Sequence, residues 1–159
     1  ILQVQQYTNN GRNINSTNSY AGVGLSDIIT PTAATSKIMV LVSGQFGIDS
    51  DNASVTHIQA GWQVTWNHSG ISESVLRKTA YSINFPEDSG MDMILHDNVN
   101  FSFIHHPNTT NAITYDVQCK CANSSASIEF ISGGSSEWYK TITLIEIGAP
   151  DTTNLVGEP

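Results

Sequence analysis

The chain has 159 residues, of which 39% are hydrophobic and only 13% are charged, and its formal net charge is −8. A chain of this size buries roughly two-thirds of the surface of its unfolded form, so it needs neither a disulfide nor a metal to fold. Its six Lys and Arg residues are scattered rather than clustered, so we expect no nucleic-acid partner and no anionic membrane surface. No segment approaches the roughly 20 apolar residues that a membrane helix requires, so we expect no membrane insertion.

Apolar and polar residues alternate with a period of two along most of the chain, and helical periodicity is nearly absent. Gly, Pro, Asn and Asp residues mark the breaks between the alternating segments. Nine strands are predicted, over residues 2–7, 20–25, 37–46, 55–66, 71–84, 99–105, 112–121, 126–131 and 140–147. Eight or nine short strands separated by such turns indicate an all-β fold, an antiparallel β-sandwich of jelly-roll type.

Residues 1–148 are predicted to form this single domain, and residues 149–159 a C-terminal tail or linker, because the tail has little to bury. The sequence begins at Ile1, and Leu2 onward is typical of a strand in mid-chain. The chain is therefore either a piece of a longer polypeptide, which we expect, or a processed product.

The segment 55–66 shows the strongest alternation. Its apolar side carries Ala60, Trp62, Val64 and Trp66, and its other side is polar. This pattern predicts a half-buried strand with both tryptophans toward the core. Residues 99–105 and 112–121 alternate in the same way.

Two segments are apolar on both faces, residues 38–42 and much of 142–147. A sandwich strand needs only one apolar face, so these segments predict a second covering surface, either a neighbouring subunit or a loop that folds back.

The two cysteines, Cys119 and Cys121, are two residues apart. In a strand they lie on the same face with about 6.8 Å between their Cα atoms, at or beyond the limit for a disulfide. We expect two reduced, packed thiols. A metal site would need two further ligands, and the sequence nominates none.

Candidate ligand-binding residues lie in four polar loops, residues 49–54, 67–72, 86–92 and 105–111, and in an aromatic pair before the last strand. Rigid scaffolds present function on loops, so we expect recognition by such loops at one end of the sandwich. The candidate residues are Asp49, Asp51, Asn52, His68, Asp88, Asp92, His105, His106, Trp138 and Tyr139.

The same residues give little support for chemistry. Adjacent strand residues point to opposite faces, so His105 and His106 cannot easily share a metal ion. The acidic loops lack the glycine and distal glutamate of an EF-hand. No nucleophile elbow, zinc-protease motif or phosphate loop is present. We expect no enzyme, no catalytic residue, no metal and no cofactor.

Six short motifs recur in the same order as in a known family. The chain resembles a β-sandwich module of tail-fibre and minor structural virion proteins of tailed phages, of the marine phage type. The motifs are Leu2-Gln3-Val4, Gly24-Leu25-Ser26, Ile29-Thr30-Pro31, Ser36-Lys37-Ile38-Met39-Val40, Thr109-Thr110-Asn111-Ala112-Ile113-Thr114-Tyr115 and Thr141-Ile142-Thr143-Leu144-Ile145-Glu146-Ile147. Residues 45–100 depart from the module, so the resemblance supplies no binding residues.

The resemblance implies a structural protein on the virion exterior, in a tail fibre or on the capsid surface, that contacts other virion proteins and commonly assembles as a homotrimer. We expect it to mediate attachment to the host cell surface, through a glycan or another receptor. Two alternatives remain open. One is a purely structural capsid decoration, head-fibre or collar protein, and the other is a polysaccharide-degrading spike domain with paired carboxylates.

Overall fold

The computed structural model describes residues 1–11, 13–50, 57–84, 93–121, 127–130 and 139–148. Within these residues the chain forms ten strands and no helix, so none of them builds a helix able to cross a membrane. The strands are β1 (Gln3–Asn9), β2 (Asn13–Asn15), β3 (Ala21–Ile29), β4 (Lys37–Ser50), β5 (His57–His68), β6 (Ile71–Asn84), β7 (Met93–His105), β8 (Ile113–Cys121), β9 (Ser127–Phe130) and β10 (Lys140–Ile147).

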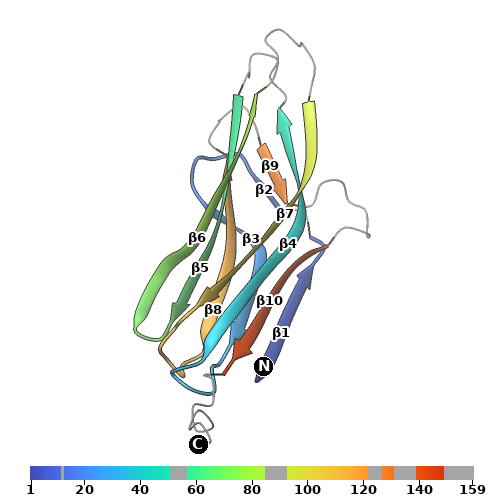
Figure 1. Cartoon of the computed structure of the whole chain (residues 1–159). Coiled ribbons are helices and arrows are strands. Elements are labelled where there is room, and N and C mark those ends of the chain that lie inside the picture. Colours follow the sequence, from blue (N-terminus) through green and yellow to red (C-terminus); the bar gives the residue numbers. More distant parts are fainter. Residues whose placement is uncertain (12, 51–56, 85–92, 122–126, 131–138, 149–159) are drawn as a thin grey trace, which may run out of the picture.

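The larger sheet is built around β4. β7 pairs with β4 antiparallel, from Ile38 opposite His105 to Ser50 opposite Met93. The other edge of β4 is shared, because β10 pairs with its first part and β9 with its last part. β1 continues the sheet beyond β10, and β2 continues it beyond β9. The six strands of this sheet therefore fill four positions across it (Figure 1).

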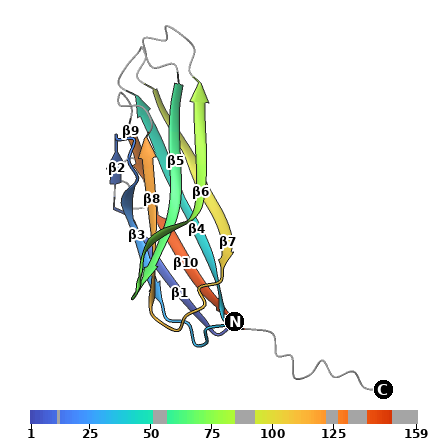
Figure 2. The same cartoon turned by 90° about the vertical axis from the view of Figure 1, so that its left-hand side faces the viewer.

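The smaller sheet has four strands in the order β3-β8-β5-β6. β8 lies in its middle and pairs antiparallel with both β3 and β5. Figure 2 shows this sheet lying over the larger one, with the strands of both running along the long axis of the molecule. The chain is thus a two-layer antiparallel sandwich.

The core lies between the two sheets and follows from the alternation in the sequence. Along β8 and along β10 every second residue is buried and the intervening residues are partly exposed. Phe46 of β4 meets Trp62 of β5 edge to face, with 5.2 Å between the ring centroids, which joins the two layers near the middle. Each fully buried aliphatic or aromatic side chain stabilises the fold by roughly 1.5–3 kcal/mol relative to an exposed one.

The predicted all-β sandwich is confirmed, as is the packing of Cys119 and Cys121 as buried, free thiols. The finer jelly-roll topology stays a prediction, and the observed strand order is compatible with it. The division into residues 1–148 and a tail also stays a prediction, because residues 149–159 lie outside the described part of the chain.

Several predicted boundaries are wrong in the same direction. Asp49 and Ser50, predicted in a loop, are the last residues of β4, where they pair with β7. Asn67 and His68, predicted in a turn, end β5 and pair with β8. β7 starts at Met93 instead of residue 99. In each case a partner strand satisfies the backbone groups of the added residues, which extends the strand past its predicted end.

The outer face of the smaller sheet is less exposed to solvent than predicted. Gln63 and Thr65 occupy outward positions of β5, yet both are buried. The Gln63 amide donates a hydrogen bond of 2.6 Å to Gln118 on the neighbouring β8. Nearby, the Tyr20 hydroxyl lies 2.8 Å from where a Cβ would stand at Gly61, so this position admits only glycine without rearrangement.

Candidate functional site

A cluster of aromatic and histidine side chains closes one end of the sandwich, the lower end in Figure 1. His105 is the last residue of β7 and points inward, with 8% of its surface exposed. Its Nδ1 lies 2.7 Å from the Tyr115 hydroxyl of β8. The ring of Trp66, from β5, meets His105 edge to face at 4.3 Å and His68 at 5.5 Å. Three strands thus contribute to this cluster.

The cluster holds His105 in its neutral form. Burial, followed by the nearby His106 and His68, lowers the pKa of His105 from 6.5 to about 4. Burial also raises the pKa of Tyr115 above its usual value of 10. Both partners of the hydrogen bond therefore stay uncharged at neutral pH, and the pair is suited to packing rather than to proton transfer.

His106 lies beside the cluster but is exposed, as the alternation along a strand requires. His68 is partly exposed, and its Nδ1 lies 2.8 Å from the Ser69 carbonyl oxygen. Among the residues that the structure describes, no three His, Cys, Asp or Glu side chains are placed to hold a metal ion together. Within the described residues, the end cluster is therefore a surface of His and Trp side chains without an assembled ion site.

The predicted ligand-binding residues do not gather in one place. His68, His105 and His106 lie at the end of the sandwich where β4 begins. Asp49 lies at the other end of β4, next to its last residue. The expectation that the loops 49–54 and 105–111 share one end is therefore wrong. Tyr139 precedes β10 and is 55% exposed. The remaining candidates lie outside the described residues: Asp51, Asn52, Asp88, Asp92 and Trp138.

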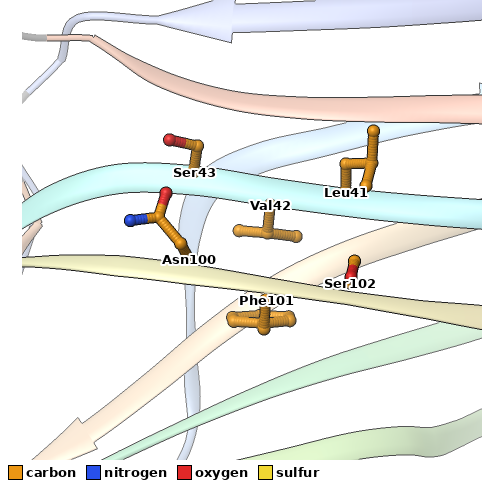
Figure 3. Close-up of a pocket in the computed structure, with 6 residues that line it drawn as sticks. All are labelled: Leu41, Val42, Ser43, Asn100, Phe101 and Ser102. Atoms are coloured by element: carbon orange, nitrogen blue, oxygen red, sulfur yellow. The ribbon is translucent and has the colours of Figure 1, made fainter.

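A shallow hollow of about 360 Å³ lies on β4 and β7, and the sequence reasoning missed it. Figure 3 shows that its lining comes from three neighbouring residues of each strand. They form the cross-strand pairs Leu41–Ser102, Val42–Phe101 and Ser43–Asn100. Ser43, Asn100 and Ser102 are small or polar outward residues, but the sequence alone does not show that these parts of β4 and β7 lie side by side.

An apolar row crosses the outer face of the larger sheet beside this hollow. The strand register places Val4, Ile145, Met39 and Ile104 next to one another across β1, β10, β4 and β7. Val4 is 54% exposed and Ile104 53% exposed, and the two inner residues are partly exposed. The predicted second covering surface of residues 38–42 and 142–147 is thus not supplied by the described part of the chain.

A buried carboxylate ties the chain's first strand to its last. Glu146 is fully buried and accepts hydrogen bonds of 2.7 Å from the Thr32 amide, the Thr32 hydroxyl and the Gln3 side chain. Burial alone would raise the pKa of Glu146, but these donors, with the nearby Ser36 hydroxyl, hold it at about 2. The carboxylate therefore stays charged. It holds β1, and the segment of residues 30–36 between β3 and β4, against β10.

A buried amine lies near the other end of β10. Lys140 is fully buried, and its Nζ donates to the Gly11 carbonyl oxygen at 2.8 Å and to the Asn13 side-chain oxygen. Burial lowers the pKa of Lys140 to about 8, and the neighbouring Cys119 opposes part of this shift. The alternation of β10 places Lys140 and Glu146 on the same face as its buried aliphatic residues, so the sequence carried a signal for both.

Comparisons with known proteins do not assign the chain to a family. No family model matches it, and no curated protein matches it. Among solved structures, the VP2 subviral particle of infectious bursal disease virus is similar, with 12% identity over 92% of this chain and 38% of that chain and a TM-score of 0.34. The T13 particle of the same virus gives 15% identity over 89% of this chain and 35% of that chain, with a TM-score of 0.34. The structure of the Gx strain of this virus has 14% identity over 89% of this chain and 37% of that chain, with a TM-score of 0.30. The chain spans less than two-fifths of each of these proteins.

Proposed function

We propose that the protein is a structural module of a virion and that it assembles with further copies of itself through the outer face of its larger sheet. The single observation that carries the assembly is the apolar row Val4–Ile145–Met39–Ile104. Soluble chains rarely leave such a continuous apolar surface uncovered, and assembled subunits bury it as a core cut in half. The virion assignment is supported by the ordered motifs that resemble the phage module.

A second copy is the occupant that suits this face best. The row on one side of the apolar one is uncharged and contains Gln6, Thr143, Leu41 and Ser102, whereas the row on the other side includes Lys37, opposite Ile147. The hollow on β4 and β7 lies on the same face and gives a neighbouring side chain a place to enter. A face that carries an apolar row, a hollow and an uncharged polar row can pack against a copy of itself, and the phage module resembled here commonly forms trimers.

Mass measurement of the native protein tests the assembly. We expect three copies for the wild-type chain and a monomer for Ile104→Lys, because a buried lysine without a partner disfavours the interface. Ile28→Lys is the matched control, since Ile28 is 54% exposed on β3 of the smaller sheet, away from the apolar row. A wild-type monomer, or equal masses for Ile104→Lys and the wild type, would remove the proposal.

We further propose that the protein attaches to a host-surface glycan. The end cluster supports it, because Trp66 is partly exposed and its ring contacts the partly exposed His68, and aromatic faces stack on sugar rings. Fluorescently labelled protein should adsorb to host cells, and Trp66→Leu with His68→Ala should reduce this adsorption at least tenfold while the oligomer stays intact. Equal adsorption by the variant would favour a purely structural decoration, head-fibre or collar role.

A further inference from the structure

The amine of Lys140 is enclosed in an unusual setting. A lysine side chain is almost never fully buried unless a partner compensates for the loss of water. Here the Nζ reaches from β10 to the start of β2, where it donates to the Gly11 carbonyl oxygen at 2.8 Å and to Asn13 Oδ1. One hydrogen bond orients the amine and the other holds a carboxamide directly against it.

The amine is partly uncharged near neutral pH. Its pKa of about 8 is well below the ordinary value of 10.5, because burial disfavours the ammonium form. A neutral lysine amine in a desolvated site is a nucleophile, as in enzymes that form covalent bonds through lysine. At pH 7 about a tenth of the Lys140 side chains are neutral, and at pH 9 most of them are.

The carboxamide of Asn13 is held in place from its other side. A Cβ at Gly24 would lie 3.3 Å from Asn13 Oδ1 and 3.6 Å from its Nδ2, so the amide packs against this glycine, whose φ is +65°. Asn9 secures the surrounding backbone, since its Nδ2 donates to the Gly24 carbonyl oxygen at 2.6 Å and its Oδ1 accepts from the Gly11 amide. Two reacting groups fixed in contact are the condition under which an intramolecular reaction becomes fast.

We propose that Lys140 and Asn13 join in an intramolecular isopeptide bond. The neutral Nζ adds to Cγ of Asn13, and the carbonyl electron pair moves to Oδ1. When this intermediate collapses, the C–N bond to Nδ2 breaks, and Nδ2 leaves as ammonia with a proton taken from Nζ. One amide replaces another, so the reaction needs no oxidant, reductant or cofactor.

The bond would lock the sandwich covalently. It joins residues 127 positions apart, from the start of β2 to the start of β10. β2 lies at the edge of the larger sheet and β10 lies between β1 and β4, so the bond would tie an edge strand to an inner strand of the sheet. Closing so long a loop stabilises a fold by restricting its unfolded state, as a disulfide does, and the two cysteines remain free thiols. This inference does not depend on the proposed function.

Intact-mass measurement of the folded full-length chain, after incubation at pH 9, tests the bond. We expect the mass to fall by that of one ammonia molecule, about tenfold faster at pH 9 than at pH 7. Proteolysis should then release a branched peptide that joins Lys140 to Asn13. Lys140→Arg and Asn13→Ala should release no such branched peptide. Lys140→Arg retains a positive charge and a long side chain, so we expect this variant to fold. Circular dichroism checks that it does.

The chain also supplies internal controls. The exposed pair Lys120 and Asn18 makes a similar contact, with 2.9 Å between Nζ and Oδ1, but its amine remains in water, so its peptides should stay separate. Ammonia can also be lost when Asn10 cyclises onto Gly11, which gives no branched peptide. Ammonia loss without the Lys140–Asn13 branch, or an unchanged mass at pH 9 in folded protein, would overturn the proposal.

Discussion

At the scale of single residues, burial decides what each polar side chain does. His105, Lys140 and Glu146 all lie on inward positions of their strands, although each is a residue type that usually remains at the surface. Each is held by specific partners: a phenol, a carbonyl and carboxamide, and a set of amide and hydroxyl donors. Alternation alone predicts their inward positions, but not these partners, which come from strands distant in sequence.

We expect protonation of His105 to lower the free energy of unfolding as the pH falls. Its pKa is about 4 in the folded chain and 6.5 when free, so protonation favours the unfolded state. The stabilising contribution is complete above pH 6.5 and is lost as the pH falls from 6.5 to 4. Between pH 7 and pH 5 this loss amounts to about 2 kcal/mol. Glu146, with its pKa of about 2, does not titrate in the folded state over this interval.

Urea unfolding of His105→Gln measures this contribution. Glutamine keeps a hydrogen-bonding group near Tyr115 but does not titrate, so the variant should lose about 2 kcal/mol less than the wild type between pH 7 and pH 5. His106→Gln, which replaces the exposed neighbour, should lose nearly as much stability as the wild type, because burial is the larger cause of the His105 shift. If His105→Gln and the wild type lose stability equally, the buried neutral histidine is not the cause.

At the scale of elements, periodicity predicted nine of the ten strands but placed several ends wrongly. β2 was missed because three residues, Asn13–Asn15, offer no alternation, and pairing with β9 alone creates the strand. β4, β5 and β7 extend past their predicted ends because their neighbours extend equally far. Local sequence determines that a strand forms, whereas the length of its partner determines where it stops.

The contact between Phe46 and Trp62 is the element-scale feature that links the sheets. Trp62 is almost fully buried, so Trp62→Ala should lower the free energy of unfolding by about 3–5 kcal/mol. Trp66 lies four residues further along β5 and is only partly buried. Trp66→Ala should therefore lower the free energy of unfolding by less. Chemical denaturation of both variants checks this order. Equal losses would mean that Trp66 is packed as tightly as Trp62, which would contradict the partial burial of Trp66.

At the scale of the whole molecule, the sandwich leaves two kinds of surface. The end cluster presents exposed histidine and tryptophan edges, and the outer face of the larger sheet presents the apolar row and the hollow. The sequence indicated an uncovered apolar face from residues 38–42 and 142–147. It did not locate the hollow or separate the candidate loops into two ends, because both depend on which strands become neighbours.

Hydroxyl-radical footprinting of the native protein tests most directly whether this outer face is covered by a second copy. Met39 lies in the apolar row and its sulfur reacts readily, and Tyr139, 55% exposed before β10, serves as the reference in the same sample. We predict that Met39 is labelled several-fold less in the wild type than in Ile104→Lys, while Tyr139 is labelled equally in both. Equal labelling of Met39 in the two proteins would contradict assembly through the larger sheet.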